Sequence, residues 1–190
     1  MTDVFKIDKA TPTHHDKYFV DTNVWFWFTY CASKEMIGLG AKRYQLYKYP
    51  EFIEKVLDSG ARLYHCPLVY SELANVIEKA EYRIYLSENQ DIDVSRKEFR
   101  QIPERRANFL KELKHAWKSV EGISNCIDVK LNSALVSRAG EVLGESVLDP
   151  YDAFYFNIMK IAGIDNIVTD DQDFLSSGVG SLYTANKSIS

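Results

Sequence analysis

The feature that most constrains the fold is a short apolar run that ends in an acidic residue. Tyr18, Phe19 and Val20 are followed by Asp21, and an aromatic stretch begins at Trp25. Because the run is short and rich in β-forming residues, we predict a buried strand over residues 18–24. A carboxylate in so apolar a context is costly to bury unless a positive group meets it. Asp21 is therefore a candidate ligand for a divalent cation.

Predicted strands and helices alternate along the rest of the chain. Strands that alternate with helices are joined by crossover connections and run parallel. We therefore predict an α/β fold, a three-layer α/β/α sandwich with a mainly parallel central sheet and a helical insertion around residues 83–125. Further strands are predicted at 61–66, 127–129, 164–169 and, as an edge strand, 180–184, and helices at 42–58, 71–86, 103–120, from 133 onwards and at 150–162.

The length and composition indicate a single globular domain. The chain has 190 residues, of which 46% are hydrophobic and 26% charged. We predict a polar N-terminal segment over 1–16, ordered only in part, and one domain over 17–190. The apolar runs are too short to span a bilayer and the N-terminus lacks the apolar core of a signal peptide. We expect a cytoplasmic protein without a membrane partner. Three widely spaced cysteines predict neither a disulfide framework nor a structural zinc site.

Four acidic side chains are predicted to converge at one edge of the sheet. In open parallel sheets, sites form outside the carboxyl ends of the strands. Asp21 lies at the end of the first predicted strand, and Asp171 lies at the end of a later one. Glu72 and Asp152 each lie in the first turn of a predicted helix. All four positions fall on the same edge, with Asp173 close by.

Ionised carboxylates cannot share a small pocket without a counter-charge. Mg²⁺ or Mn²⁺ supplies that charge and prefers oxygen ligands. Such a site suits phosphodiester hydrolysis, in which a carboxylate can also take a proton from the attacking water. Two neighbouring acids are interpreted differently: we expect Asp149 to be a helix cap, and we prefer Asp171 to Asp170 as the ligand.

The charge is unevenly distributed along the chain. The formal net charge is −4, but residues 96–118 hold eight basic and three acidic side chains, which gives +5 there and −9 elsewhere. The segment is either a solvated helix face or a surface that meets a polyanion. In the second interpretation, the candidate RNA-binding residues are Arg105, Arg106, Lys111, Lys114 and Lys118.

Taken together, the acidic motifs resemble the PIN-domain family of metal-dependent nucleases. Residues 21–24 (Asp-Thr-Asn-Val) resemble the opening strand motif of that family, and 71–73 (Ser-Glu-Leu) resemble its helix glutamate. Residues 152–153 (Asp-Ala) resemble its third acid, and 169–174 (Thr-Asp-Asp-Gln-Asp-Phe) are similar to its Thr-x-Asp-x-Asp-Phe ending. The resemblance covers roughly residues 17–82 and 126–184, and it is specific only when the motifs are combined.

The resemblance implies the PIN sandwich fold and cleavage of single-stranded RNA by a Mg²⁺- or Mn²⁺-dependent ribonuclease. Asn23 would orient Asp21 or the metal-bound water, and Thr169 would hydrogen-bond within the acidic cluster. Many small bacterial members are VapC-like toxins of type II toxin–antitoxin pairs, so a small antitoxin protein and a homodimer are expected partners. This chain is longer than those toxins, mainly through residues 83–125. The catalytic acids would be Asp21, Glu72, Asp152 and Asp171, with Asp173 added to the same four as metal ligands.

Two other functions are compatible with parts of the pattern. A haloacid-dehalogenase-type phosphatase also begins with an acid at a strand end, but it needs a second Asp two residues later. Asn23 occupies that position here, which disfavours a nucleophilic Asp mechanism. A non-catalytic PIN-like scaffold that binds RNA or protein would be recognised by the loss of acids, and here all of them are present.

Overall fold

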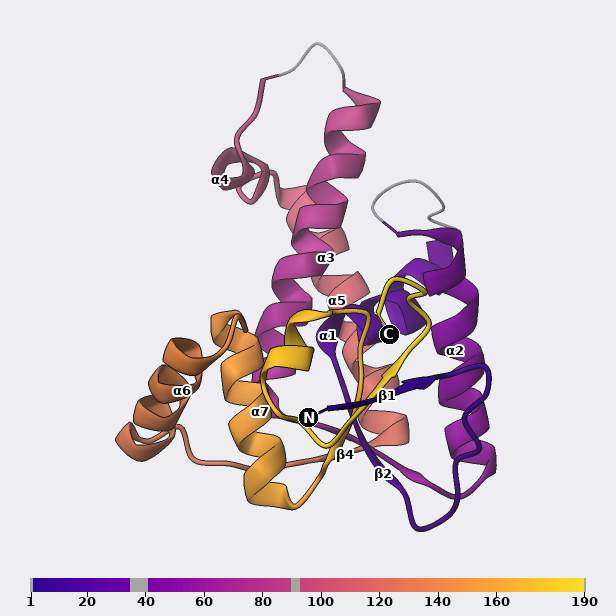
Figure 1. Ribbon diagram of the computed structural model, residues 1–190. Helices are drawn as coiled ribbons and strands as arrows, with labels where there is room; N and C mark the ends of the chain where they lie inside the picture. Colours follow the sequence, from indigo (N-terminus) through magenta and orange to yellow (C-terminus); the bar gives the residue numbers. More distant parts are fainter. Residues whose placement is uncertain (1, 35–40, 90–92, 190) are drawn as a thin grey trace.

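The central element is a six-stranded sheet in which every neighbouring pair of strands is parallel. The computed structural model describes residues 2–34, 41–89 and 93–189 (Figure 1). The strand order is β1-β6-β5-β2-β3-β4. The strands are β1 (Asp3–Lys6), β2 (Lys17–Val20), β3 (Arg62–His65), β4 (Ser124–Cys126), β5 (Asn166–Val168) and β6 (Ser181–Thr184).

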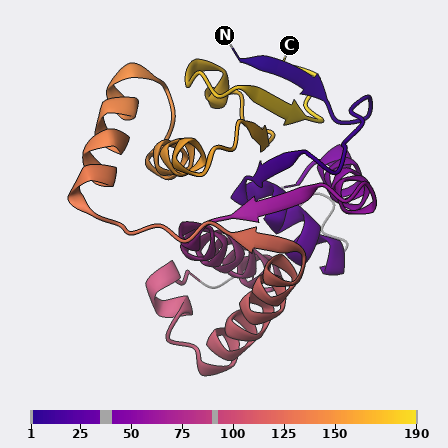
Figure 2. The same ribbon diagram turned by 90° about the horizontal axis from the view of Figure 1, so that it is seen from below.

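Helices connect the strands and cover both faces of the sheet. Figure 2 shows α7 on one face, with α6 outside it, and α2 on the other face. Helices α3 and α5 pack against each other beside the β4 end of the sheet. The α/β/α sandwich predicted from the sequence is therefore confirmed. The helices are α1 (Thr22–Phe26), the π-helix η1 (Trp27–Cys31), the 3₁₀ turn η2 (Ala32–Lys34), α2 (Arg43–Asp58), α3 (Pro67–Glu88), α4 (Arg96–Phe99), α5 (Pro103–Ile123), α6 (Ser133–Glu145), α7 (Pro150–Ala162) and the 3₁₀ turn η3 (Asp173–Ser176).

The strand predicted over 18–24 is wrong in its second half. β2 ends at Val20, and α1 begins two residues later at Thr22. Asp21 keeps an extended backbone and occupies the N-cap position of α1. Asp is favoured at this position, but the Asp21 side chain makes no capping hydrogen bond to α1. The aromatic stretch that follows is helical, and Trp25 and Trp27 are buried in the core.

Two other strands differ from the prediction. The polar N-terminal segment contains β1, an edge strand that pairs with β6, so β6 lies inside the sheet instead of at its edge. β4 lies at 124–126 instead of 127–129. Alternate residues of β1 are exposed, which explains why its sequence is too polar to be recognised as a strand.

Residues 83–125, predicted as a helical insertion, belong to a crossover connection in the described part of the chain. Helix α3 begins at Pro67 and continues to Glu88. The predicted helix started four residues later, at 71, although proline is favoured at the first position of a helix. Residues 90–92 lie outside the described part of the chain. Helix α5 leads directly into β4, which is parallel to β3. The helices of this segment thus form the connection from β3 to β4.

The described residues contain no disulfide, and the three cysteines are free, as predicted. Within the same ranges, no helix is long and apolar enough to cross a membrane.

Candidate functional site

The acidic site is built around two neighbouring strands, β2 and β5. Val20 of β2 pairs with Val168 of β5, so the residues that follow them lie side by side. The Asp21 backbone N–H donates to the Val168 carbonyl over 3.1 Å. The Thr169 hydroxyl donates to Asp21 Oδ2 over 2.8 Å, and both side chains are buried. The predicted role of Thr169, a hydrogen bond within the acidic cluster, is therefore confirmed.

A tight turn after β5 positions Asp171 and Asp173. The Asp171 backbone N–H donates to Thr169 Oγ1 over 3.0 Å. The Asp173 backbone N–H then donates to Asp171 Oδ1 over 2.8 Å. These bonds hold the Asp171 carboxylate beside the Thr169–Asp21 pair. Asp173 contacts Asp171 through its backbone.

Helix α3 contributes Glu72, in its second turn instead of the predicted first turn. The Tyr155 hydroxyl of α7 donates to Glu72 Oε2 over 2.6 Å. The same hydroxyl lies 2.9 Å from Thr22 Oγ1 of α1. Tyr155 therefore joins three helices, and the sequence did not identify it. Its position one turn after Asp152 on α7 is the signal that could have found it.

Helix α7 contributes Asp152. Asp149 caps this helix, as predicted, because its Oδ1 accepts from the Asp152 backbone N–H over 3.0 Å. The side chain of Asp152 is buried. Asp170 lies elsewhere: its carboxylate accepts hydrogen bonds from Tyr44, Gln45 and Tyr49 of α2. That network points Asp170 toward α2 and leaves Asp171 as the acid that faces the cluster.

Burial is the main cause of the raised pKa values of the four acids. It raises the pKa of Asp21 from its ordinary value of 3.8 to about 7, with repulsion from Glu72 adding to the shift and the Thr169 hydrogen bond opposing it. Burial likewise raises the pKa of Glu72. The four acids are thus close enough to repel one another, as expected for carboxylates at one sheet edge.

The other two acids behave in the same way. Burial raises the pKa of Asp152 to about 10, and the charges of Asp21 and Asp149 contribute. Burial also raises the pKa of Asp171. No Lys or Arg in the described ranges forms an ion pair with these four acids. A positive charge added here would therefore be strongly favoured.

The chemistry of this donor set fits a hard divalent cation, although the side chains do not already form a ligand shell. Among the described residues, no three His, Cys, Asp or Glu side chains are arranged to hold a metal ion. Ionised carboxylates repel one another, and a bound cation would compensate that repulsion. Asp21, Glu72, Asp152 and Asp171 would have to turn toward a common point to hold it.

The five basic residues predicted to bind RNA do not form one free patch. Arg105 pairs with Glu88 at 3.0 Å, and Arg106 lies 4.0 Å from Glu78. The other three are exposed and lie along one side of α5 by their spacing: Lys111, Lys114 and Lys118. Helix α5 precedes β4, which is separated from β2 by β3.

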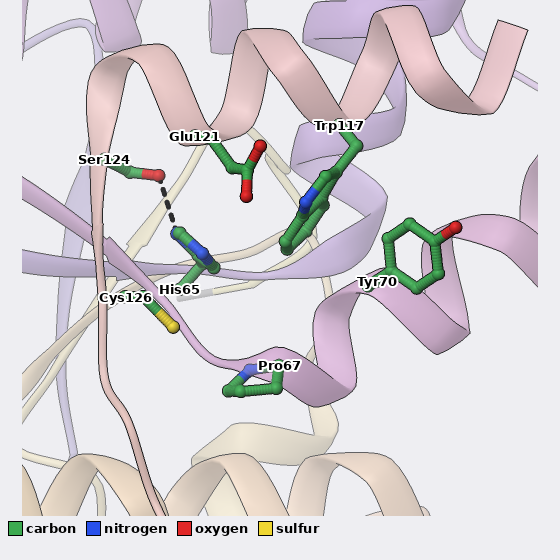
Figure 3. A pocket seen from close by; sticks show the side chains of 7 residues that line it. All are labelled: His65, Pro67, Tyr70, Trp117, Glu121, Ser124 and Cys126. Carbon is green, nitrogen blue, oxygen red and sulfur yellow. Dashed lines mark hydrogen bonds between the residues drawn. The ribbon is translucent and has the colours of Figure 1, made fainter. Parts of the chain in front are cut away.

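A separate cavity of about 480 Å³ lies where β3 and β4 meet α3 and α5 (Figure 3). Ser124 Oγ donates to the Val120 carbonyl over 2.6 Å and lies 2.8 Å from His65 Nδ1. Because the Ser124 proton is used by that carbonyl, His65 does not activate Ser124 as a nucleophile. Burial lowers the pKa of His65 and raises that of Cys126, so the thiol is not activated either. The cavity is lined by His65, Pro67, Tyr70, Trp117, Glu121, Ser124 and Cys126.

No protein-family model matches the chain. No curated protein matches it either. Among solved structures, the fold is similar to the crystal structure of PAE2754 from Pyrobaculum aerophilum, with 17% sequence identity and a TM-score of 0.45. That match covers 92% of this chain and 88% of the other. Similarity at this level carries no argument about function.

Proposed function

We propose that this protein is a metal-dependent endoribonuclease that hydrolyses phosphodiester bonds of single-stranded RNA. The observation that carries the proposal is the cluster of four carboxylates at one sheet edge, Asp21, Glu72, Asp152 and Asp171, with raised pKa values. These four would hold Mg²⁺ or Mn²⁺, with Asp173 adjacent. The bound cation supplies Lewis-acid activation of water and of the scissile phosphate. The resemblance of the acidic motifs to PIN-domain nucleases supports the same proposal.

The residues of the chain have distinct tasks in this proposal. Thr169 and Tyr155 orient Asp21 and Glu72 through their hydrogen bonds. Asp171 is only half-buried and is the best placed to take a proton from the attacking water.

The biological setting stays a prediction. The activity would take place in the cytoplasm, and a small antitoxin protein and a homodimer are the expected partners. The phosphatase alternative is disfavoured by Asn23, which lines a groove beside the acids and supplies no second carboxylate. The non-catalytic scaffold is the second candidate, because the carboxylates do not yet converge on one point.

A cleavage assay tests the proposal. Purified protein is incubated with end-labelled single-stranded RNA in EDTA, Mg²⁺ or Mn²⁺, beside an Asp21→Asn/Asp171→Asn variant. We expect cleavage only with metal and only by the wild type. A p-nitrophenyl phosphate assay in parallel separates a nuclease from a phosphatase. Absence of RNA cleavage with both metals would contradict the nuclease and favour the scaffold.

A further inference from the structure

A groove of about 210 Å³ lies between α3 and the α1–η1 segment. Asn23, two residues after Asp21, is one of its lining residues, and Glu72 lies on the helix that forms the other wall. The groove is therefore formed by the two segments that also carry Asp21 and Glu72. Its lining residues are Asn23, Phe26 and Trp27 on one wall and Val76, Lys79, Ala80 and Arg83 on the other.

One face of α3 connects the acids with the basic end of this groove. Glu72, Val76, Lys79 and Arg83 are spaced by four, three and four residues, which places them along one side of the helix. At a rise of 1.5 Å per residue, Lys79 lies about 10 Å and Arg83 about 16 Å along the helix axis from Glu72. A strand that enters the acidic site along α3 would therefore pass both cations.

The two cations are not neutralised within the described part of the chain. Lys79 and Arg83 are exposed, and no ion pair links either of them to a described acid. The neighbouring acids on α3 are already engaged: Glu78 with Arg96 and Arg100, and Glu81 with Lys34. Two uncompensated positive charges in a chain of net charge −4 attract a polyanion to this groove.

The aromatic wall of the groove indicates what part of a nucleic acid it contacts. Phe26 is 8% exposed and Trp27 is 6% exposed, so neither ring offers a free face for a base to stack on. Recognition in the groove would therefore come from charge and would not depend on the base sequence.

We propose that Lys79 and Arg83 bind backbone phosphates of single-stranded RNA next to the scissile phosphodiester. This proposal rests on the proposed function for its position beside the acids. It assigns a sequence-independent phosphate subsite to α3, whereas the sequence pointed to α5. The groove guides the strand along α3, and the acids at its end meet the bond to be cleaved.

The test measures binding without cleavage. Fluorescein-labelled single-stranded RNAs of uridine and of adenosine are titrated with Asp21→Asn protein, and anisotropy is recorded from 50 to 300 mM KCl. Lys79→Gln and Arg83→Gln are each added to this background, and Arg62→Gln is the matched control, because Arg62 is an exposed cation at the start of β3, the strand end opposite the acids. For single strands, log K falls as log salt rises, and each lost phosphate contact reduces the magnitude of that slope by about 0.7.

We expect each groove variant to reduce the magnitude of the slope by about 0.7 and the double variant by about 1.4, equally for both RNAs, while Arg62→Gln leaves it unchanged. An unchanged slope in the groove variants, or an equal effect of Arg62→Gln, overturns the proposal. A loss confined to one RNA sequence also overturns it. If the wild type cleaves no RNA but the groove variants still lower the slope, the phosphate subsite stands and the nuclease function fails.

Discussion

Replacing Asp21 by Asn is expected to stabilise the metal-free protein at alkaline pH. The Asp21 carboxylate is 2% exposed and has a pKa raised to about 7 by burial, with repulsion from Glu72 contributing. An amide of the same shape keeps an oxygen for the Thr169 hydroxyl. The Asp21 side chain makes no capping hydrogen bond to α1, so none is lost. The NH₂ group of the amide can donate to the neighbouring carboxylates. The substitution therefore removes the buried charge without removing its contacts.

The magnitude follows from the pKa. In the unfolded chain the pKa is near 3.8, so the folded state gives up stability as the pH rises from about 4 to about 7. A shift of about 3 pH units corresponds to on the order of 4 kcal/mol, which is the upper limit of the gain from Asp21→Asn at pH 8. Burying the amide offsets part of this, which leaves about 1–4 kcal/mol. In a chain of this size that raises Tm by about 3–10 °C.

Thermal unfolding in EDTA at pH 8 measures the effect, with Glu54→Gln as the control because Glu54 is an exposed acid in the middle of α2. At pH 4.5 the gain should be about 3 kcal/mol smaller than at pH 8, because Asp21 is then protonated in the folded wild type while the cost of burying the amide is unchanged. Added Mn²⁺ should raise the Tm of the wild type and not that of Asp21→Asn. A Tm of Asp21→Asn at pH 8 that is equal to or below that of Glu54→Gln would refute the argument.

Three further predictions follow from single contacts. The pKa of Asp152 in the folded protein is raised to about 10, so its contribution to stability is complete below about pH 4 and is lost as the pH rises. Urea unfolding in EDTA should therefore give a lower free energy of unfolding at pH 9 than at pH 5. A constant or rising free energy of unfolding would contradict this. Tyr155→Phe removes the hydrogen bond to Glu72 and should cost about 2 kcal/mol in the same assay; an unchanged unfolding midpoint would show that the bond contributes nothing. A Cβ at Gly180 would lie 2.9 Å from the Cβ of Asp165, so Gly180→Ala should destabilise the protein by about 1–3 kcal/mol. Gly140 lies in α6 with open space around it, so Gly140→Ala should stabilise the protein by about 1 kcal/mol. Equal unfolding midpoints for the two variants would contradict the packing argument.

The sequence was sufficient for most of the sheet and for the location of the acids because both depend on short-range signals. A buried parallel strand is a continuous apolar run, and an acid after such a run falls at the carboxyl edge. Asp21 and Asp171 were placed correctly in this way. The same signals misjudged β1, whose alternating exposure resembles a polar loop, and the start of α1, because Thr22 and Val24 are β-branched residues that favour strands.

The remaining features depend on contacts between distant segments. Tyr155 reaches Glu72 across 83 residues of sequence, and Asp170 is bound by α2 across more than 120. No local pattern encodes such pairs. Lys79 and Arg83 could have been found, because their spacing from Glu72 places all three on one side of the same helix. The prediction instead chose α5, because basic residues are denser in 96–118.

The central claim is that this carboxylate edge holds a divalent cation, and Mn²⁺ binding measured by electron paramagnetic resonance tests it most directly. Free Mn²⁺ gives a sharp six-line signal that weakens on binding, so a titration yields both stoichiometry and affinity. We expect the wild type to bind Mn²⁺, the Asp152→Asn variant to lose most of that binding, and the Glu54→Gln control to match the wild type. Equal binding by the wild type and Asp152→Asn, or no binding by the wild type, would contradict the claim.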